Sequence, residues 1–178
     1  IAILAPGAMG SAVARRLSEH GARVLTSLKG RSEATQKRAA DAGMIGADDD
    51  AIAGADIFLS IVPPGEAVAL AEQLAALIVR REHKPIVVDC NAVNVDTVQR
   101  IEEIIGSAQA PFVDAGIIGF PPQPGGKSPA FYMSGEHAKD VVVLKEFGLD
   151  VRIVEGPVGA ASALKMSYAG IVKGLAGI

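Results

Sequence analysis

Short apolar segments alternate with amphipathic stretches along most of the sequence, and this alternation limits the fold more than any other feature. The apolar segments predict strands at Ile1–Ala5, Arg23–Ser27, Ile57–Val62, Ile86–Asp89, Phe112–Ala115, Ala130–Ser134 and Val151–Val154. The stretches between them predict helices at Ala8–His20, Ser32–Ala42, Glu66–Val79, Val95–Ile105 and His137–Phe147. Parallel neighbours in a sheet need crossover helices of this kind. The sequence therefore predicts an α/β fold with a doubly wound, mostly parallel sheet.

The last part of the chain breaks this alternation, because residues 159–178 are expected to form one helix. An apolar stripe runs along it at spacings of four, three, four and three, through Leu164, Tyr168, Ile171, Leu175 and Ile178. The stripe is still running at the last residue. We therefore expect residues 1–158 to form one domain, and residues 159–178 to begin a long helix that leads into an all-α second domain.

Composition excludes several classes of function. The formal net charge is −3, which provides no basic surface for nucleic acid. No apolar run approaches the length of a membrane span, and the three histidines (His20, His83 and His137) show no metal-ligand spacing. The single cysteine, Cys90, fits a reducing compartment. We expect a cytoplasmic protein without a metal site that binds a small-molecule substrate and neither nucleic acid nor membrane.

The turn after the first strand carries part of a dinucleotide-binding fingerprint. The pattern Gly-x-Gly-x-x-Gly appears as APGAMG, so Gly7 and Gly10 are present and Ala5 replaces the first glycine. In a Rossmann turn the second glycine lets pyrophosphate approach the backbone, and the third lets helix and strand pack closely. The helix N–H groups supply an anion site. We predict cofactor contacts from Pro6, Gly7, Ala8, Met9 and Gly10; the alternative is a tight turn whose small residues serve packing alone.

The end of the second strand indicates which dinucleotide binds. An acidic residue there would hold the ribose 2′-hydroxyl of NAD, but residues 26–32 (TSLKGRS) contain none. Cations and hydroxyls suit a 2′-phosphate. The sequence therefore favours NADP, with NAD as the alternative cofactor, through Ser27, Lys29, Arg31 and Ser32. The competing interpretation is a solvated basic turn that begins a helix.

Several stretches resemble the β-hydroxyacid dehydrogenase superfamily, which includes 3-hydroxyisobutyrate dehydrogenase and 6-phosphogluconate dehydrogenase. They run over essentially the whole chain and read APGAMGSAV, SIVPPGEAV, VVDCNAVNVDTVQRI, FVDAGIIGF and GPVGAASALKMSYAG. The last is the most specific, because Lys165 there matches the catalytic lysine of the family. The IIGFPP and GRS segments look more like an uncharacterised branch of the 6-phosphogluconate dehydrogenase-like group. The resemblance implies a Rossmann-type NAD(P)-binding domain, an all-α domain beyond it, and a homodimer in the intact protein.

The resemblance also implies roles for residues at strand ends. Val62 and Pro63 would flank the adenosine-side ribose, and Asn91 and Ala92 would lie near the nicotinamide. The substrate would be lined by the backbone of Gly116, Ile117, Ile118 and Gly119. Tyr168 stands next to the position where the family usually has Asn and is a candidate hydrogen-bond donor in its place; the alternative is that it only packs within the apolar stripe. Asp89 and Asp114 are expected to cap or orient loops rather than act as a base.

Two departures affect the substrate signature of the family. Ile118, Gly119 and Phe120 stand where the family usually has Ser-Gly-Gly, and Ala169 stands where it usually has Asn. A positioned lysine can still exchange a proton with the substrate oxygen and stabilise its charge. We expect the N-terminal end of its helix to lower the pKa of Lys165; the alternative is an ordinary surface lysine. The sequence thus predicts an NADP-preferring dehydrogenase or reductase that acts on the CH–OH group of a small hydroxy acid or on its carbonyl partner. The alternatives are an imine or keto reductase, a group that usually lacks this lysine, and a non-catalytic NADP-binding redox sensor.

Overall fold

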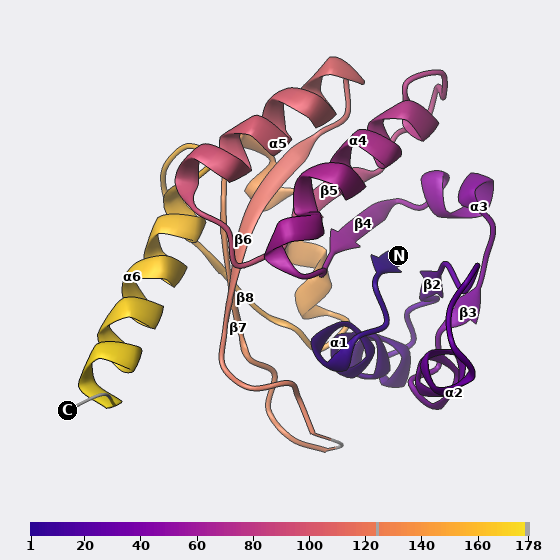
Figure 1. Ribbon diagram of the computed structural model, residues 1–178, viewed down its shortest axis with the longest axis horizontal. Helices are drawn as coiled ribbons and strands as arrows, with labels where there is room; N and C mark the ends of the chain where they lie inside the picture. Colours follow the sequence, from indigo (N-terminus) through magenta and orange to yellow (C-terminus); the bar gives the residue numbers. More distant parts are fainter. Residues whose placement is uncertain (124, 177–178) are drawn as a thin grey trace.

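The computed structural model describes residues 1–123 and 125–176, and within them eight strands form one sheet (Figure 1). The sheet order is β3-β2-β1-β4-β5-β6-β7-β8. All neighbouring pairs are parallel except the antiparallel pair β6 and β7. The prediction of a doubly wound, mostly parallel α/β sheet is therefore confirmed. The strands are β1 (Ala2–Leu4), β2 (Leu25–Thr26), β3 (Ile45–Gly46), β4 (Ile57–Ser60), β5 (Ile86–Asp89), β6 (Phe112–Ile118), β7 (Ala130–Ser134) and β8 (Asp150–Ile153).

Helices cover both faces of the sheet (Figure 1). One face packs against α1 (Ala8–Glu19), α2 (Glu33–Asp41) and the 3₁₀ segments η2 (Glu136–Lys139) and η3 (Val142–Lys145). The other packs against α3 (Asp49–Ala53), α4 (Ala67–Ile78) and α5 (Val95–Ser107), with the 3₁₀ turn η1 (Pro64–Glu66) before α4. The last helix, α6 (Ala160–Ala176), lies against β6 and β7 beside α5. Each face thus has its own aliphatic core, with the sheet between them.

The order of the strands creates a switch point at the carboxyl ends of β1 and β4. The chain builds β1, β2 and β3 in one direction and then crosses to β4 on the other side of β1. In open α/β sheets, ligands bind at such a switch point, beyond the carboxyl ends of the strands. Four residues lie in register, as one row, across β1, β4, β5 and β6 near the carboxyl ends of these strands, in the order Leu4, Ser60, Asp89 and Asp114. Residues that follow this row line the candidate site.

Two predicted elements differ from the structure. The helix predicted at 137–147 is wrong, because η2 and η3 occupy this segment as separate 3₁₀ turns. Three consecutive valines at 141–143 explain this, since β-branched side chains disfavour an α-helix. The strand predicted at 112–115 extends to Ile118, because antiparallel pairing with β7 provides hydrogen-bond partners for its second half.

The apolar stripe predicted on the last helix is not buried in the described part of the chain. Leu164, Tyr168 and Ile171 are 39%, 48% and 63% exposed. The helix instead packs against the sheet near its N-terminus through Ala161 and Ser162, which are fully or almost fully buried. Ile178 and the side chain of Leu175 lie outside the described residues.

Candidate functional site

The turn between β1 and α1 has the properties of a phosphate site. Gly7 is the N-cap of α1, the first turn of the helix holds no acidic residue, and no side chain of the described residues caps it. The N–H groups of the first helical turn therefore point outward without an intrahelical acceptor. A Cβ on Gly7 would meet nothing within 4 Å, whereas a Cβ on Gly10 would overlap the Ala5 carbonyl oxygen. The turn thus keeps the open approach and the close packing of the fingerprint, although its first glycine is Ala5.

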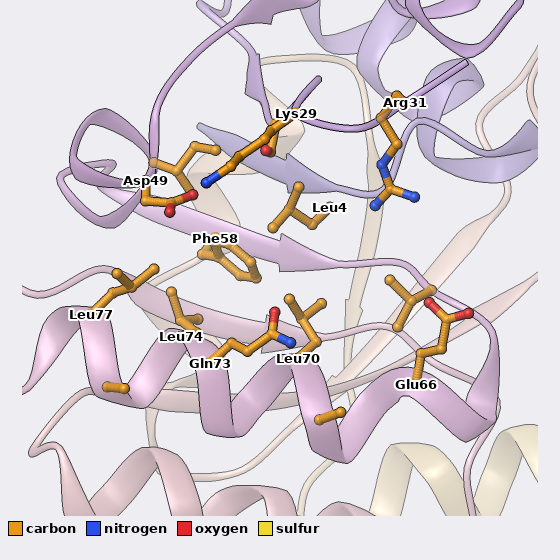
Figure 2. Close-up of a pocket in the computed structure, with 15 residues that line it drawn as sticks. Leu4, Lys29, Arg31, Asp49, Phe58, Glu66, Leu70, Gln73, Leu74 and Leu77 are labelled. Carbon is orange, nitrogen blue, oxygen red and sulfur yellow. The ribbon is translucent and has the colours of Figure 1, made fainter.

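A pocket of about 700 Å³ lies over β1 and β4 (Figure 2). Leu4, just before the turn, lines it, whereas the predicted cofactor residues at positions 6–10 do not. One wall comes from the loop after β2, and the other from α4. Four of the predicted cofactor residues line it, namely Ser27, Lys29, Arg31 and Val62. The predicted Ser32 does not; its Oγ accepts a hydrogen bond from the Thr35 amide and caps α2. The structure therefore brings together the loop after β2 and the end of β4, which are far apart in the sequence.

The pocket pairs an apolar wall with charged ends. Leu70, Leu74 and Leu77 form the α4 wall, which suits the flat apolar ring of a nucleotide base. Figure 2 shows Lys29 and Asp49 at one end of the pocket and Arg31 and Glu66 at the other. Sequence reasoning predicted the two cations but missed the two acids and Gln73, which also lines the pocket. Helical periodicity located α4, but it does not tell which of its polar residues border the cavity.

Asn91 links the ends of β4 and β5. Its side chain is buried, its Nδ2 donates to Ser60 Oγ (2.7 Å) and Asp89 Oδ1 (2.5 Å), and its Oδ1 accepts from the Val62 amide (2.7 Å). The side chain is thus engaged with protein groups, so any contact with a nicotinamide has to come from its backbone. The neighbouring predicted residues Pro63 and Ala92 are both exposed at the same edge.

Asp89 is a buried carboxyl group at the carboxyl end of β5. Burial raises the pKa of Asp89 to about 6, against the opposing effect of hydrogen bonds from Asn91 and Ser60. The charge of Asp114 on the neighbouring strand raises it further. Its Oδ2 atom accepts no hydrogen bond from any of the described residues.

Asp114 holds the N-terminus of α6, as expected of a capping residue. Its Oδ2 accepts hydrogen bonds from the Gly159 amide (2.9 Å), the Ser162 amide (3.0 Å) and Ser134 Oγ (3.1 Å). Its Oδ1 accepts from Ser162 Oγ (2.6 Å). A buried carboxylate at a helix N-terminus satisfies backbone donors and opposes the helix dipole. The first turn of α6, which precedes Lys165, is thereby fixed to the sheet.

Lys165 lies one turn further along α6 and crosses the end of β6. Its Nζ donates a hydrogen bond to the Ile117 carbonyl oxygen. A Cβ on Gly116 would lie 2.9 Å from the Lys165 Cβ, so only glycine allows α6 to approach the strand this closely. Because Gly116 and Ile117 follow Asp114 in β6, the ammonium group lies beyond the row that marks the candidate site.

The electrostatic surroundings of Lys165 come mainly from burial. Partial burial is the larger influence and lowers the pKa of Lys165, whereas the charge of Cys90 acts in the opposite direction. Burial is therefore the cause of this shift, where the sequence pointed to the helix N-terminus. Cys90 is itself buried, as expected of a small apolar residue, and burial raises the pKa of its thiol well above the usual value.

The predicted substrate residues separate into two groups. Gly116 and Ile117 lie beside Lys165, whereas Ile118 and Gly119 line an open groove of about 520 Å³ formed with the loop before β7. Tyr168 follows Lys165 on α6 by three residues, which places it on a neighbouring part of the helix surface. Its side chain is half exposed.

No three metal-ligating side chains gather in the described part of the chain to form a metal site. The described helices include none with the length and apolar character needed to span a bilayer.

Comparisons with known proteins agree with this geometry. The profile of the NAD binding domain of 6-phosphogluconate dehydrogenase matches residues 1–142. An uncharacterized 28.5 kDa protein from Methanothermus fervidus is 34% identical over 159 residues, which cover 87% of this chain and 58% of that protein. This chain therefore spans less than two thirds of that relative.

Solved structures extend the likeness to almost the whole chain. The conserved protein MTH1747, described as structurally similar to 3-hydroxyacid dehydrogenases, is 29% identical with a TM-score of 0.86, over 98% of this chain and 64% of that one. An imine reductase from Myxococcus stipitatus in complex with NADP⁺ is 24% identical with a TM-score of 0.79, over 98% of this chain and 61% of that one, and shares the fold. The chain thus has a hydroxyacid dehydrogenase-like NAD(P)-binding fold, and it belongs to the family of the 6-phosphogluconate dehydrogenase NAD-binding domain.

Proposed function

We propose that this chain is the cofactor-binding part of an NADP-preferring oxidoreductase that transfers hydride between the nicotinamide and a small hydroxy acid or its carbonyl partner. The observation that carries the proposal is the position of Lys165. Its half-buried ammonium group donates a hydrogen bond to the Ile117 carbonyl oxygen, at the same carboxyl ends of the strands as the Gly7 turn. Such a reaction requires a phosphate site and a proton-exchanging group on the same side of the sheet, beyond the carboxyl ends of the strands.

The residues present fit a dinucleotide phosphate. The first turn of α1 would hold the pyrophosphate, since Gly7 leaves the approach open and no acidic side chain repels the anion. The α4 wall of the pocket would cover the adenine ring. Lys29 and Arg31 would attract the 2′-phosphate of NADP, with Arg31 able to bind two of its oxygens at once.

Lys165 would manage the proton of the reaction. When bound, the nicotinamide supplies or accepts the hydride. In the oxidative direction Lys165 would take the hydroxyl proton as the carbonyl forms, and in the reductive direction it would return it. The pKa of Lys165 is lowered by burial, so a neutral amine is more accessible than it is for a lysine in water. The Ile117 carbonyl holds Nζ at a defined place before substrate binds.

Two observations favour an imine or keto reductase as the second candidate. Ile118 and Ala169 remove the serine and asparagine that the hydroxyacid dehydrogenases usually offer to the substrate. The likeness to an imine reductase fold points the same way. The presence of Lys165 favours the dehydrogenase. A non-catalytic NADP-binding redox sensor is the third candidate, and it predicts no role for Lys165 in any chemistry.

The intact protein would complete the substrate site. We propose that α6 leads into an all-α domain and that the protein is a cytoplasmic homodimer, with residues 1–158 as the cofactor domain. The exposed apolar side chains Leu164, Tyr168 and Ile171 support a further partner for this helix, because a stripe of this kind is seldom left in water. Substrate would then bind between Lys165 and that partner.

The first experiment is a calorimetric titration of the chain with NADPH and with NADH. We expect NADPH to bind more tightly, and Arg31→Ala to weaken NADPH by about 10-fold to 100-fold with little effect on NADH. Arg100→Ala is the matched control, since Arg100 is an exposed arginine on α5 and does not line the pocket. Equal affinity for both cofactors would contradict the NADP preference. Binding of neither would contradict the cofactor site.

The second experiment tests Lys165 in the intact protein against panels of hydroxy acids, ketones and imines. Lys165→Ala is expected to lower kcat by about 100-fold or more without weakening NADPH binding. Turnover of imines alone would favour the second candidate. Unchanged turnover by Lys165→Ala would remove the lysine from the mechanism, and the lack of any turnover together with tight NADPH binding would favour the sensor.

A further inference from the structure

We propose that Asp89 is a positioning residue for the cofactor site, which acts through Asn91 on the turn at residues 61–63. This inference deepens the proposed function, because the turn it acts on borders the cofactor pocket through Val62. Asp89 itself is the last residue of β5 and is buried. Its effect on the site therefore passes through the side chain of Asn91, which connects Asp89 to the Val62 amide.

The hydrogen bonds allow Asn91 one orientation of its amide. The Val62 N–H needs an acceptor, and Asn91 Oδ1 provides it at 2.7 Å. Nδ2 is then directed at Ser60 Oγ and at Asp89 Oδ1. A flipped amide would set Nδ2 against the Val62 N–H and Oδ1 against the Asp89 carboxylate, which leaves both contacts repulsive. The carboxylate thus selects the orientation that holds Val62.

Asp89 also borders the wall of the cofactor pocket. It lines a narrow cavity of about 10 Å³ together with Phe58, Leu70 and Leu74, and these three residues also line the pocket of about 700 Å³. Asp89 and the pocket of about 700 Å³ therefore share these apolar side chains as neighbours. The apolar surroundings explain why its second oxygen, Oδ2, has no hydrogen-bond partner among the described residues.

The charge state of Asp89 depends on few neighbours. Asp114 is its partner in register on β6, and Cys90, whose thiol has a raised pKa, follows it on β5. Glu102 of α5 interacts with Asp114, and Lys165 of α6 interacts with Cys90. Burial is the largest cause that raises the pKa of Asp89 to about 6. The carboxylate is therefore present above that pH and is lost below it, and with it the charge-assisted bond to Asn91.

Nuclear magnetic resonance of the 178-residue chain without cofactor tests this coupling. We expect the Val62 amide and the Asn91 side-chain NH₂ signals to shift together between about pH 5 and about pH 7, with a midpoint near pH 6, because the pKa of Asp89 is raised to about 6. In Asp89→Asn this shared transition should disappear. Glu102→Gln is the matched control, because Glu102 is another nearby acid with a raised pKa, and it should leave the transition in place. A Val62 signal that does not titrate, or that titrates equally in Asp89→Asn, would overturn the proposal.

Cofactor binding gives the second readout. NADH is the suitable probe, because it lacks the 2′-phosphate, which titrates in the same range. We expect the affinity of the wild type for NADH to fall about 2-fold to 4-fold from pH 7.5 to pH 5.5, because about three quarters of a carboxyl group with a pKa of about 6 is protonated at the lower pH. The affinity of Asp89→Asn is expected to stay at or below this lower value at both pH values. The same fall in both proteins would contradict a positioning role.

The two readouts separate this inference from the proposed function. If neither cofactor binds, the proposed function fails, while the Val62 titration still decides whether Asp89 controls the turn. Ser60→Ala serves if Asp89→Asn does not fold. It removes one acceptor of Asn91 Nδ2 but keeps the carboxylate, so we expect the Val62 transition to persist with a shifted midpoint. An unshifted midpoint would show that the three side chains do not act together.

Discussion

At the scale of single residues, the two glycines of the first turn have different tasks. Gly10 is required by the protein itself, because a methyl group there would overlap the Ala5 carbonyl oxygen. Gly7 has room for a methyl group and an ordinary φ of −73°, so nothing in the protein alone demands glycine at this position. The open space at Gly7 is explained by a ligand that approaches the backbone.

This difference predicts opposite behaviour of two alanine variants. Gly10→Ala is expected to lose about 1–3 kcal/mol of unfolding free energy, because the turn must shift to remove the overlap. Gly7→Ala is expected to keep its stability within about 0.5 kcal/mol and to bind NADPH at least several-fold more weakly. Urea denaturation and calorimetric titration measure the two effects. A Gly7→Ala variant that binds NADPH as the wild type does would place the pyrophosphate elsewhere.

Some residues of the candidate site could be predicted from the sequence, and the contacts of others could not. The fingerprint located Gly7 and Gly10 because their spacing follows from local backbone geometry. The family resemblance implies that Asn91 lies near the nicotinamide, and this stays a prediction. The sequence did not indicate the contacts of its side chain with Ser60, Asp89 and the Val62 amide. These partners come from two different strands, and their contacts depend on a register that one sequence does not contain.

At the scale of elements, α6 is positioned by its N-terminus rather than by its apolar stripe. Four hydrogen bonds converge on Asp114 from β7 and from the start of the helix. Ser134 Oγ also accepts from the Ala161 amide at 3.0 Å. This buried cap fixes the helix one turn before Lys165, so the position of the ammonium group depends on it.

Ser162→Ala tests this dependence. The variant loses the hydrogen bond from Ser162 Oγ to Asp114 Oδ1 but keeps the one from its amide. We expect a loss of about 1.5–3 kcal/mol of unfolding free energy, as for other hydrogen bonds to charged groups, measured by urea denaturation. Ser107→Ala is the control, since its hydroxyl bonds the Ile104 carbonyl at an exposed site. Equal losses in the two variants would show that Asp114 is not a special anchor for α6.

The sequence predicted the elements of the sheet better than those that follow β6. Strands β1, β4 and β5 were recognised because buried parallel strands are continuous apolar runs. The second half of β6 was missed, because Gly116 and its neighbours become strand only through pairing with β7. Leu164, Tyr168 and Ile171 of the predicted stripe lie on α6, and all three are exposed in the described part of the chain. Helical periodicity predicts an apolar face, but it does not tell which element covers that face.

At the scale of the whole molecule, two buried carboxyl groups, Asp89 on β5 and Asp114 on β6, lie in register but differ in their hydrogen bonding. Asp114 receives four hydrogen bonds, whereas Asp89 leaves one oxygen without a partner in the described structure. We therefore expect the ionised Asp89 to lower the stability of the folded chain relative to a neutral side chain at this position. Functional residues commonly reduce stability in this way, which is consistent with a positioning role at the cofactor edge.

This cost should appear in the pH dependence of folding. In the unfolded chain the pKa of Asp89 has the ordinary value for this side chain, about 3.8, whereas burial raises the pKa of Asp89 in the folded state to about 6. Between these values the folded state binds more protons than the unfolded state, so this group makes unfolding easier as the pH rises and has no further effect above about pH 7. At 1.36 kcal/mol for each pH unit between the two pKa values, the loss is about 3 kcal/mol.

The difference between the wild type and Asp89→Asn isolates this contribution from those of the other carboxyl groups. We expect the unfolding free energy of the wild type to fall by about 3 kcal/mol relative to the variant between about pH 4 and about pH 7, in urea denaturation at a series of pH values. Glu102→Gln, measured in the same way, should give a smaller change, because Glu102 is far less buried. A constant difference between the wild type and Asp89→Asn would mean that the carboxyl group of Asp89 titrates alike in both states. Asp89 would then not change its charge near neutral pH in the folded protein, and the turn at Val62 would lose its proposed pH dependence.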